Sequence, residues 1–280
     1  MPPLRKLAFV VNSDKAGAPG LGRELMAIAR QAGARIKITS RFPLPRGYLR
    51  GCDACCVIGG DGTLLGVAAE AVRSQVPIIG VNRGSLGFLT TFSADEARAR
   101  FADLLGGSFR LDHRSMLSCV AGRGPAALAL NDVLVKDVVN SRLIRLGVMA
   151  DGELVTDYLC DGLIFSTPTG STAYNLSAGG PIIHPAARVL AMTPICPHTL
   201  SNRAVIFPEK AQLKVLNRSP GARMLVSLDG QRNLRVVGDG PVRISIAKLR
   251  LPLLRHTGQG YFAIVRTKLE WSGGLAGEKK

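Results

Sequence analysis

The segment Val57-Ile58-Gly59-Gly60-Asp61-Gly62-Thr63-Leu64-Leu65 surrounds one carboxylate with three glycines, directly after an apolar run. That run, at 54–58, has no charged residue, which is typical of a strand buried on both faces of a sheet. Apolar residues then recur at helical spacing over 63–73. Because ligands of open α/β sheets bind at the carboxyl ends of strands, this strand–turn–helix unit predicts a ligand site around Asp61.

The residues of this turn suit a phosphorylated ligand. Without side chains, the glycines would let a polyphosphate approach backbone N–H groups, with a helix N-terminus behind them. A carboxylate would repel phosphate, so its presence suggests that Asp61 either accepts a proton from an attacking hydroxyl or helps to hold Mg²⁺. The alternative is a structural turn in which Asp61 only caps the following helix. No lysine follows the turn, so it is not a P-loop.

The first 112 residues alternate strand and helix patterns around this segment. Strands are expected at 7–11, 35–39, 54–58 and 77–81, with helices beginning near residues 21, 63 and 94. Such alternation favours a parallel sheet with helices on its faces. We therefore predict an α/β N-terminal domain over 1–112 with a parallel, Rossmann-like sheet.

From residue 113 the pattern changes to short β-rich runs, at 126–135, 143–149, 163–166, 204–207, 224–228 and 242–246. Asp151-Gly152 and Asp229-Gly230 are expected hairpin turns. Long helical patterns are missing from this part of the sequence. It therefore predicts a β-rich, β-sandwich-like domain over 113–255, and 256–280 is expected to form a C-terminal strand and tail.

Composition limits the partners. The 280 residues carry a formal net charge of +16, but the basic residues are spread along the chain and only 5% of residues are aromatic. A nucleic-acid platform is therefore not expected.

No run approaches the roughly 18 apolar residues that span a bilayer, and the first apolar run is too short for a secretory signal. Cys52 and Cys55 have metal-ligand spacing but no second pair, so no zinc site is expected. We expect a cytoplasmic protein without a membrane partner.

A polar loop follows the strand expected at 163–166. Residues 166–177 are rich in hydroxyls and end in Tyr174-Asn175-Leu176-Ser177. Such a loop suits ribose hydroxyls, an amide or an adenine edge, and Tyr174 could pack its flat face on a base. The pair Asn131-Asp132 could bind an adenine edge and a ribose diol, although Asn-Asp pairs also favour ordinary turns.

Together these segments resemble the NAD kinase family. The glycine-flanked aspartate is shared with lipid kinases and phosphofructokinases, whereas the polar loop and the Thr-Pro-Ile-Cys-Pro-His segment at 193–198 are more specific. The resemblance implies a two-domain enzyme, with its site between the domains, that transfers the γ-phosphate of ATP to the 2′-hydroxyl of the adenosine ribose of NAD, giving NADP. The matching segments occur in the family's order: 59–63, Asn131-Asp132, 161–181, 193–203 and 229–231.

The resemblance also implies residue roles. Asp61 would accept the proton of the ribose hydroxyl, Asn131 and Asp132 would contact the adenosine half of NAD, and Tyr174 would pack against it. Asp161 would hydrogen-bond the nicotinamide end, including across a subunit contact. Mg²⁺ or another divalent cation, ATP as donor, and a homodimer or homotetramer are implied, with no metal ligand assigned. The remaining implied binding residues are Gly59, Gly60, Gly62, Thr63, Phe88, Arg142, Thr172, Ala173, Asn175, Leu176, Ser177 and Gln231.

Two departures from the family pattern bear on substrate binding. Asp132 stands where glutamate is usual, and Leu159 stands where a basic residue is common. They affect the ribose contact and the balance between NAD and NADH. A lipid kinase of the diacylglycerol or sphingosine type is the alternative enzyme, but the polar loop speaks against it. A non-catalytic nucleic-acid-binding protein is suggested only by the charge, and inorganic polyphosphate is an alternative donor.

Overall fold

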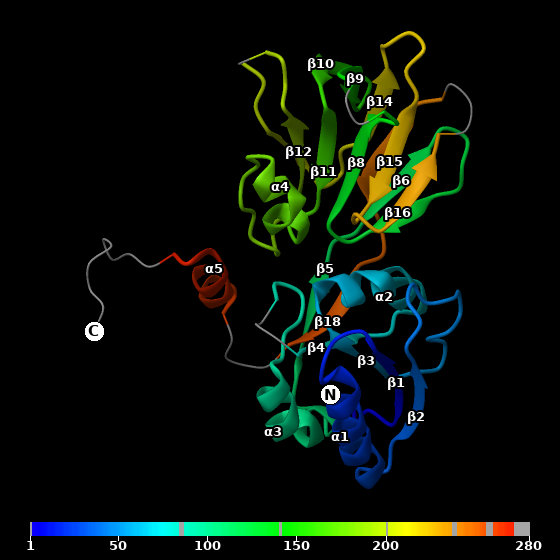
Figure 1. Cartoon of the computed structure of the whole chain (residues 1–280), viewed down its shortest axis with the longest axis vertical. Helices are drawn as coiled ribbons and strands as arrows, with labels where there is room; N and C mark the ends of the chain where they lie inside the picture. Colours follow the sequence, from blue (N-terminus) through cyan, green and yellow to red (C-terminus); the bar gives the residue numbers. More distant parts are fainter. Residues whose placement is uncertain are drawn as a thin grey trace. The chain divides into compact units, whose positions relative to one another are not determined.

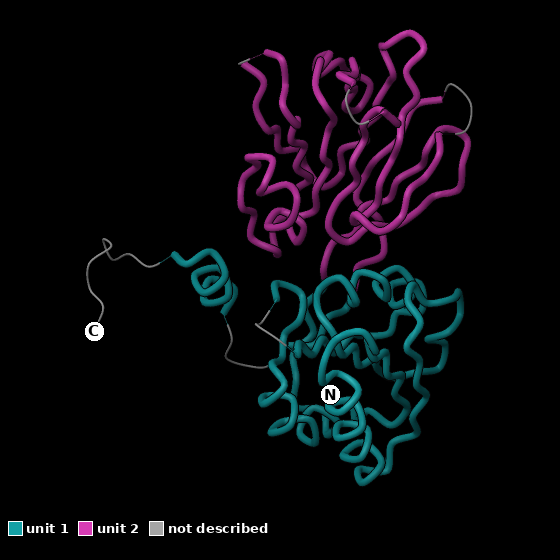
Figure 2. Tube along the Cα trace, viewed as in Figure 1, with its two compact units in different colours: residues 1–113, 252–280 teal, residues 114–251 magenta. Residues whose placement is uncertain are grey.

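The structure is a computed structural model that describes residues 2–83, 87–139, 142–199, 201–236, 240–255 and 260–271. The chain divides into two compact units (Figure 2): unit 1 comprises 1–113 with 252–280, and unit 2 comprises 114–251. Residues 252–255, which the sequence pattern had grouped with the β-rich domain, cluster with unit 1. They belong to strand β18 (Leu251–Arg255), which is part of the sheet of unit 1.

Unit 1 is built on a six-stranded sheet with the order β2-β1-β3-β4-β18-β5 (Figure 1). Neighbouring strands from β2 to β18 pair in parallel, as the alternating pattern predicted. The carboxyl ends of β1, β3 and β4 therefore lie at one edge, where Gly59 pairs with Asn82 and Ile58 with Val11. The strands are β1 (Lys6–Val11), β2 (Arg35–Thr39), β3 (Ala54–Gly59), β4 (Ile78–Asn82) and β5 (Arg110–Arg114).

Helices cover both faces of this sheet. Helices α1 (Ala18–Gln31) and α3 (Ala94–Leu105) share one apolar core with alternate strand residues such as Phe9 and Ile58. Helix α2 (Asp61–Ser74) packs on the opposite face, where a Cβ on Gly80 would come within 3.0 Å of the Leu64 side chain. Strand β3 is buried along its whole length because both faces are covered, which explains its apolar sequence.

The C-terminal segment differs from the prediction. Residues 261–269 form helix α5 (Tyr261–Leu269), not the strand expected within 256–280. The aromatic and β-branched run favours a strand by propensity. In the structure Ile264 and Val265 are buried while Phe262 and Ala263 are exposed, which is a helical pattern of burial. Packing of that face therefore overrides the local preference of the sequence.

Unit 2 consists of two six-stranded sheets, as its β-rich pattern predicted. Within both sheets the paired strands run antiparallel, and the sheets share one core that includes Leu146 and Val215 from the first and Phe165 from the second. The first sheet, in the order β10-β9-β14-β17-β6-β7, comprises β6 (Leu117–Ala121), β7 (Ala127–Ala129), β9 (Ile144–Ala150), β10 (Glu153–Cys160), β14 (Leu213–Asn217) and β17 (Val242–Ile246). The second, in the order β13-β12-β11-β8-β15-β16, comprises β8 (Asp132–Asp137), β11 (Gly162–Ser166), β12 (Val189–Ile195), β13 (Val205–Pro208), β15 (Met224–Leu228) and β16 (Arg232–Arg235).

The strand pairing in unit 2 brings together two segments in which binding residues were predicted, the end of β11 and the start of β8. Both expected hairpins are confirmed, with Asp151 and Asp229 in the left-handed region at φ 51° and 52°. The run expected at 126–135 is divided between β7 and β8, which lie in different sheets. Because Ser166 pairs with Asp132, the end of β11 meets the start of β8 at one edge of the second sheet.

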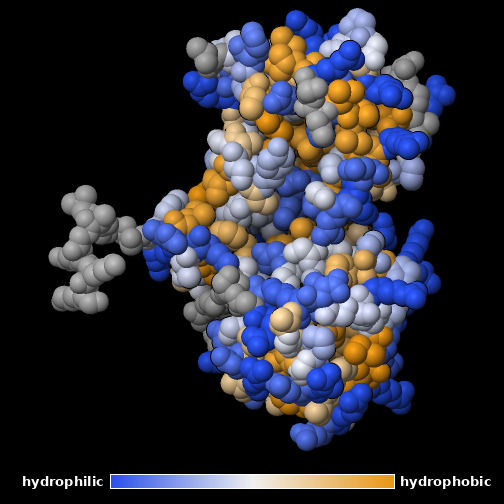
Figure 3. Space-filling view, viewed as in Figure 1, coloured by the Kyte–Doolittle hydropathy of each residue, from blue (hydrophilic) through white to orange (hydrophobic). Residues whose placement is uncertain are grey.

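The visible face of each unit mixes hydrophilic residues with hydrophobic patches (Figure 3), and the hydrophilic ones are scattered, in keeping with charges spread along the chain. Among the described residues, none of the helices has the length and apolar character required to cross a membrane. All six cysteines are free thiols, including Cys52 and Cys55.

Candidate active site

The carboxylate of Asp61 is fixed by the loop that follows β4. Its Oδ2 accepts the N–H of Phe88 at 2.9 Å, and its Oδ1 accepts the N–H and the hydroxyl of Thr90 at 3.0 and 3.1 Å. The N–H of Leu89 lies 3.3 Å from both oxygens. A Cβ on Gly87 would stand 2.1 Å from Oδ1, so only glycine fits there. Four donors therefore hold this carboxylate in one orientation.

The capping alternative for Asp61 is wrong. Gly60 is the N-cap residue of α2, and no side chain makes a cap hydrogen bond there. Asp61 is the first residue of the helix and its side chain bonds a different loop. The sequence therefore provides an acidic residue at the positive end of α2 without using it as a cap.

The glycines of the turn have different roles. A Cβ on Gly59 would lie 2.5 Å from the Thr63 hydroxyl, so Gly59 makes room for that buried side chain. The Thr63 hydroxyl accepts from Asn12 Nδ2 at 3.1 Å, which makes it a structural link within unit 1. Gly60 is half-buried and Gly62 is exposed, so solvent reaches this part of the turn. Sequence reasoning missed Lys15, which reaches this turn from the loop after β1; no motif marks it.

Unit 2 brings Asn131-Asp132 and the polar loop together, and adds Asp229. The Asp229 carboxylate accepts the N–H groups of Leu130, Asn131 and Asp132 at 2.9, 2.7 and 3.1 Å. The N–H of Thr167 donates to the Asn131 carbonyl oxygen at 2.9 Å. The Asn-Asp pair is thus held from two sides. Sequence reasoning recognised the segment 229–231 but did not assign Asp229 this anchoring role.

Two carboxyl groups share this edge of the sheet. Asp132 is only 5% exposed, and its burial together with the charge of Asp229 raises the pKa of its carboxyl to about 7. Burial also raises the pKa of Asp229, although the three backbone N–H groups oppose that effect. Near neutral pH, Asp132 can therefore either donate a hydrogen bond to a ligand oxygen or accept one from a ligand hydroxyl.

The polar loop contains a 3₁₀ turn, η1 (Gly170–Thr172), and one short helix, α4 (Tyr174–Ser177). Asn175 is fully buried: its Nδ2 donates to the Ser171 and Pro181 carbonyl oxygens at 3.1 Å each, and its Oδ1 accepts from Thr193 at 2.7 Å. The Asn175 side chain therefore holds the loop in shape. By contrast, 46% of Tyr174 is exposed, and Ser177 is exposed as well. Thr172, Ala173 and Leu176 are half-buried.

Replacement of Gly170 by alanine tests how the loop places Asn131. A Cβ at position 170 would lie 2.1 Å from the Asn131 carbonyl oxygen, which is backbone and cannot rotate away. We expect a loss of about 1–3 kcal/mol in the free energy of unfolding, measured in urea. Gly20→Ala is the matched control because its added Cβ meets nothing within 4 Å. Equal stability of the two variants would contradict this account of the loop.

Other predicted residues lie elsewhere in unit 2. Asp161 precedes β11 while the polar loop follows it, so the length of the strand, roughly 15 Å, separates them. Arg142 is exposed just before β9, near the same far end. Gln231 is exposed directly after the Asp229-Gly230 turn. Within one chain, unit 2 therefore groups Gln231 with the Asn131 edge, but not Asp161 or Arg142.

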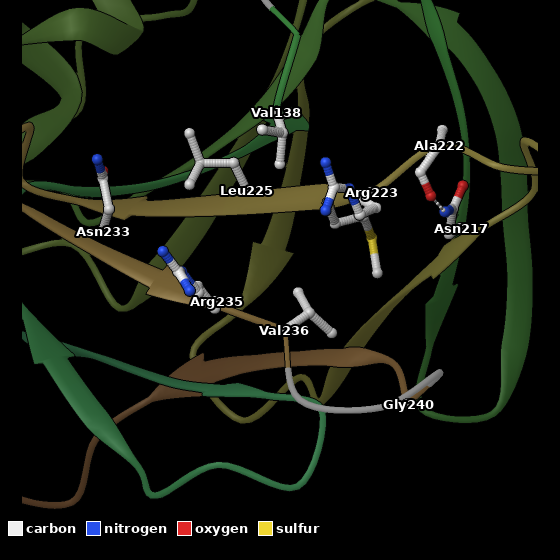
Figure 4. Close-up of a pocket in the computed structure, with 10 residues that line it drawn as sticks. Val138, Asn217, Ala222, Arg223, Leu225, Asn233, Arg235, Val236 and Gly240 are labelled. Carbon is white, nitrogen blue, oxygen red and sulfur yellow. Dashed lines mark hydrogen bonds between the residues drawn. The ribbon is translucent and has the colours of Figure 1, made fainter.

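A cavity of about 690 Å³ in unit 2 lies outside this group of residues (Figure 4). Val138, Arg223 and Arg235 line it, and none of the binding residues predicted from the sequence does. It opens near Met224 at the start of β15, whereas Asp229 follows the end of that strand. The cavity is therefore at the opposite edge of the sheet.

Comparison with known proteins covers both units. Residues 43–109 match the family model for the ATP-NAD kinase N-terminal domain, and 130–255 match that for the ATP-NAD kinase C-terminal domain. An NAD kinase of Pseudomonas fluorescens is 38% identical over 231 residues, which is 81% of this chain and 78% of that protein. An NAD kinase of Geotalea daltonii is 42% identical over 223 residues, 78% of each protein.

Two solved structures share the fold. Yeast NADH kinase, complexed with NADH, has a TM-score of 0.88 at 23% identity, covering 99% of this chain and 90% of that one. An NAD kinase from Archaeoglobus fulgidus, in complex with ATP, has a TM-score of 0.79 at 24% identity, covering 96% and 100%. They support the α/β arrangement of unit 1 and the β-rich arrangement of unit 2.

The Asp61 carboxylate is held in one orientation beside a glycine turn, on the edge where α/β sheets bind nucleotides. This arrangement is typical of a phosphoryl-transfer enzyme. The family models and the relatives at 38% and 42% identity narrow this class: the chain belongs to the NAD kinase family, and it phosphorylates NAD. The lipid-kinase alternative finds no support in these matches.

Proposed function

We propose that the protein transfers the γ-phosphate of ATP to the 2′-hydroxyl of the adenosine ribose of NAD, giving NADP. The observation that carries this proposal is the Asp61 carboxylate, oriented by Phe88 to Thr90 at the carboxyl edge of the parallel sheet. In this proposal the parallel sheet of unit 1 acts as a Rossmann-like platform for the donor, and unit 2, as a β-sandwich, recognises NAD.

Asp61 would accept the proton of the 2′-hydroxyl as the new P–O bond forms. Its two oxygens already receive four donors, so one lone pair must become available. The Thr90 hydroxyl, the side-chain donor among the four, would release Oδ1, while its oxygen still accepts the Gly87 N–H at 3.0 Å and Asn82 Nδ2 at 3.2 Å. The backbone donors would keep the carboxylate in place during this exchange. Positioning and charge stabilisation would supply most of the catalysis.

The turn suits a divalent cation that arrives with the donor. Asp61 is the only carboxylate in the turn at 59–63, and among the described residues no cluster of three His, Cys, Asp or Glu side chains could hold a metal. Mg²⁺ is commonly held mainly by substrate phosphates, so the donor would bring it to the turn. When bound, it would neutralise charge on the triphosphate.

NAD recognition would involve Asn131 and Asp132 at the adenosine half, and Tyr174 as a packing surface. Tyr174 is the aromatic residue of the loop with an exposed face. Tyr174→Ala is expected to raise KM for NAD about 10-fold, since stacking on a base is worth about 1–3 kcal/mol, and to leave KM for ATP unchanged. Tyr174→Phe keeps the ring and serves as the control. An unaltered KM for NAD in the alanine variant would contradict the assignment.

We propose further that the protein works as a homodimer or homotetramer. Asp161 and Arg142 lie at the far end of β11 from the polar loop, which supports a role for them on NAD bound by a second copy. The six free thiols favour a reducing compartment, which supports a cytoplasmic location.

The direct test is incubation of the purified protein with ATP, Mg²⁺ and NAD, followed by an enzymatic assay specific for NADP. Parallel reactions with NADH and with inorganic polyphosphate define the acceptor and the donor. Absence of NADP, with phosphorylation of a diacylglycerol instead, would replace the proposal by its alternative.

A further inference from the structure

A lysine from the loop between β1 and α1 lies beside the glycine turn. Lys15 Nζ donates to the Gly59 carbonyl oxygen at 3.3 Å and to Asn82 Oδ1 at 3.0 Å. These acceptors end β3 and β4, so the ammonium group lies at the edge where α2 begins. A Cβ on Gly60 would stand only 3.2 Å from Nζ, so the glycine leaves room for the ammonium group.

The loop that carries Lys15 is held in place. The backbone N–H of Lys15 donates to the Asn12 carbonyl oxygen at 3.3 Å, and the Ala18 N–H donates to the Lys15 carbonyl oxygen at 3.0 Å. The side chain of Asn12 donates to the Thr63 hydroxyl, which joins this loop to the turn of Asp61. Lys15 is half-buried, so its charge is positioned before any ligand arrives.

The positive charge of Lys15 is not neutralised by an acidic side chain within the part of the chain that the structure describes. Both acceptors are uncharged oxygens, which leaves one of the three ammonium donors without a partner among those residues. The neighbouring carboxylate of Asp61 accepts from the 88–90 loop and forms no ion pair with Lys15. A spare charged donor beside open glycine backbone suits the oxygen of an anion.

We propose that Lys15 Nζ binds a phosphate oxygen of the polyphosphate donor. The inference rests on the proposed function and names a donor-binding residue for it. The sequence excludes a P-loop because no lysine follows the glycines, yet the fold brings a lysine to them from 44 positions before Gly59. The recognised chemistry is a chain of phosphates, which both ATP and inorganic tripolyphosphate carry.

The test compares Lys15→Gln with Lys6→Gln. Lys6 is an exposed lysine at the other end of β1, so it controls for loss of one charge in the same unit. Lys15→Gln should raise KM for ATP about 10- to 100-fold, as expected for one charge-assisted hydrogen bond, while KM for NAD and Tm stay unchanged. Lys6→Gln should behave as the wild type. Calorimetric titration with ATP and Mg²⁺, without NAD, should show the same loss of affinity.

Titration with tripolyphosphate shows whether Lys15 contacts the phosphate chain or another part of ATP. Weaker binding of both titrants by Lys15→Gln supports a contact with the phosphate chain, and weaker binding of ATP alone overturns it. An unchanged KM and affinity for ATP in Lys15→Gln would also overturn the proposal. So would an equal rise in KM for ATP and for NAD together with a lowered Tm, because Lys15 would then stabilise the fold and not bind the donor. If the wild type forms no NADP, the proposed function fails, and the calorimetric comparison still decides the role of Lys15.

Discussion

Replacing Asp61 with asparagine is expected to lower kcat by about 10²- to 10⁴-fold, the usual cost of losing a general base. KM for NAD should stay within a few-fold of the wild-type value, because Asp61 belongs to unit 1 and the proposed NAD contacts of Asn131 and Tyr174 belong to unit 2. Steady-state kinetics with ATP, Mg²⁺ and NAD measure both constants. A variant with near-normal kcat would remove Asp61 from the chemistry.

The structure adds a complication that the sequence could not reveal. The Asp61 carboxylate also accepts three backbone N–H groups of the 88–90 loop, and an asparagine would turn an NH₂ group towards one of those donors. Thr90→Val separates the two effects, since it removes the hydroxyl donor to Oδ1 and leaves the backbone donors to Asp61 in place. It also removes the oxygen that accepts the Gly87 N–H and Asn82 Nδ2. We expect this variant to keep kcat within about 10-fold. If it loses as much activity as Asp61→Asn, the carboxylate acts chiefly by ordering the loop.

Much of unit 1 follows from local pattern. Strand β2 has the predicted bounds and helix α3 begins where predicted. Strands β1 and β3 differ by one residue at one end, and β4 is displaced by one residue at both ends. Strands β1, β3 and β4 are predictable because strands buried on both faces are apolar. The start of α3 is predictable because Ser93 and Glu96 form a capping box there. The position of Asp61 at the carboxyl edge follows from the same rule.

The contacts that shape the site could not be read from the sequence. Asp229 anchors Asn131 across nearly 100 positions, and Lys15 reaches Gly59 across 44. Nothing local distinguishes these two residues from ordinary turn and loop residues, because their partners are set by strand order. Asn175 shows the reverse case: the loop composition suggests a ligand contact, whereas its side chain is buried among its own unit's carbonyl and hydroxyl groups.

Asp132 is expected to make the stability of unit 2 depend on pH. Its folded-state pKa of about 7 lies above the ordinary value of 3.8, so the native state holds a proton that the unfolded state has lost. The contribution of Asp132 to the free energy of unfolding should therefore be fully present below about pH 4, and it should be lost as the pH rises through 7. A shift of this size corresponds to about 4 kcal/mol in total, because one pKa unit is worth about 1.4 kcal/mol.

Asp132→Asn keeps the shape of the side chain and cannot ionise. Urea unfolding of the variant and the wild type should therefore give free energies that diverge by about 3 kcal/mol between pH 5 and pH 8, with the variant the more stable at pH 8. Asp103→Asn, which changes an exposed carboxyl on α3, controls for the loss of one charge and should follow the wild type at each pH. Parallel curves for Asp132→Asn and the wild type would mean that Asp132 ionises in the folded protein as readily as in the unfolded chain. Divergence of the two stability curves would instead identify Asp132, which stands where glutamate is usual in the family, as a buried acid that is partly protonated at neutral pH. Asp229 is its neighbouring charge.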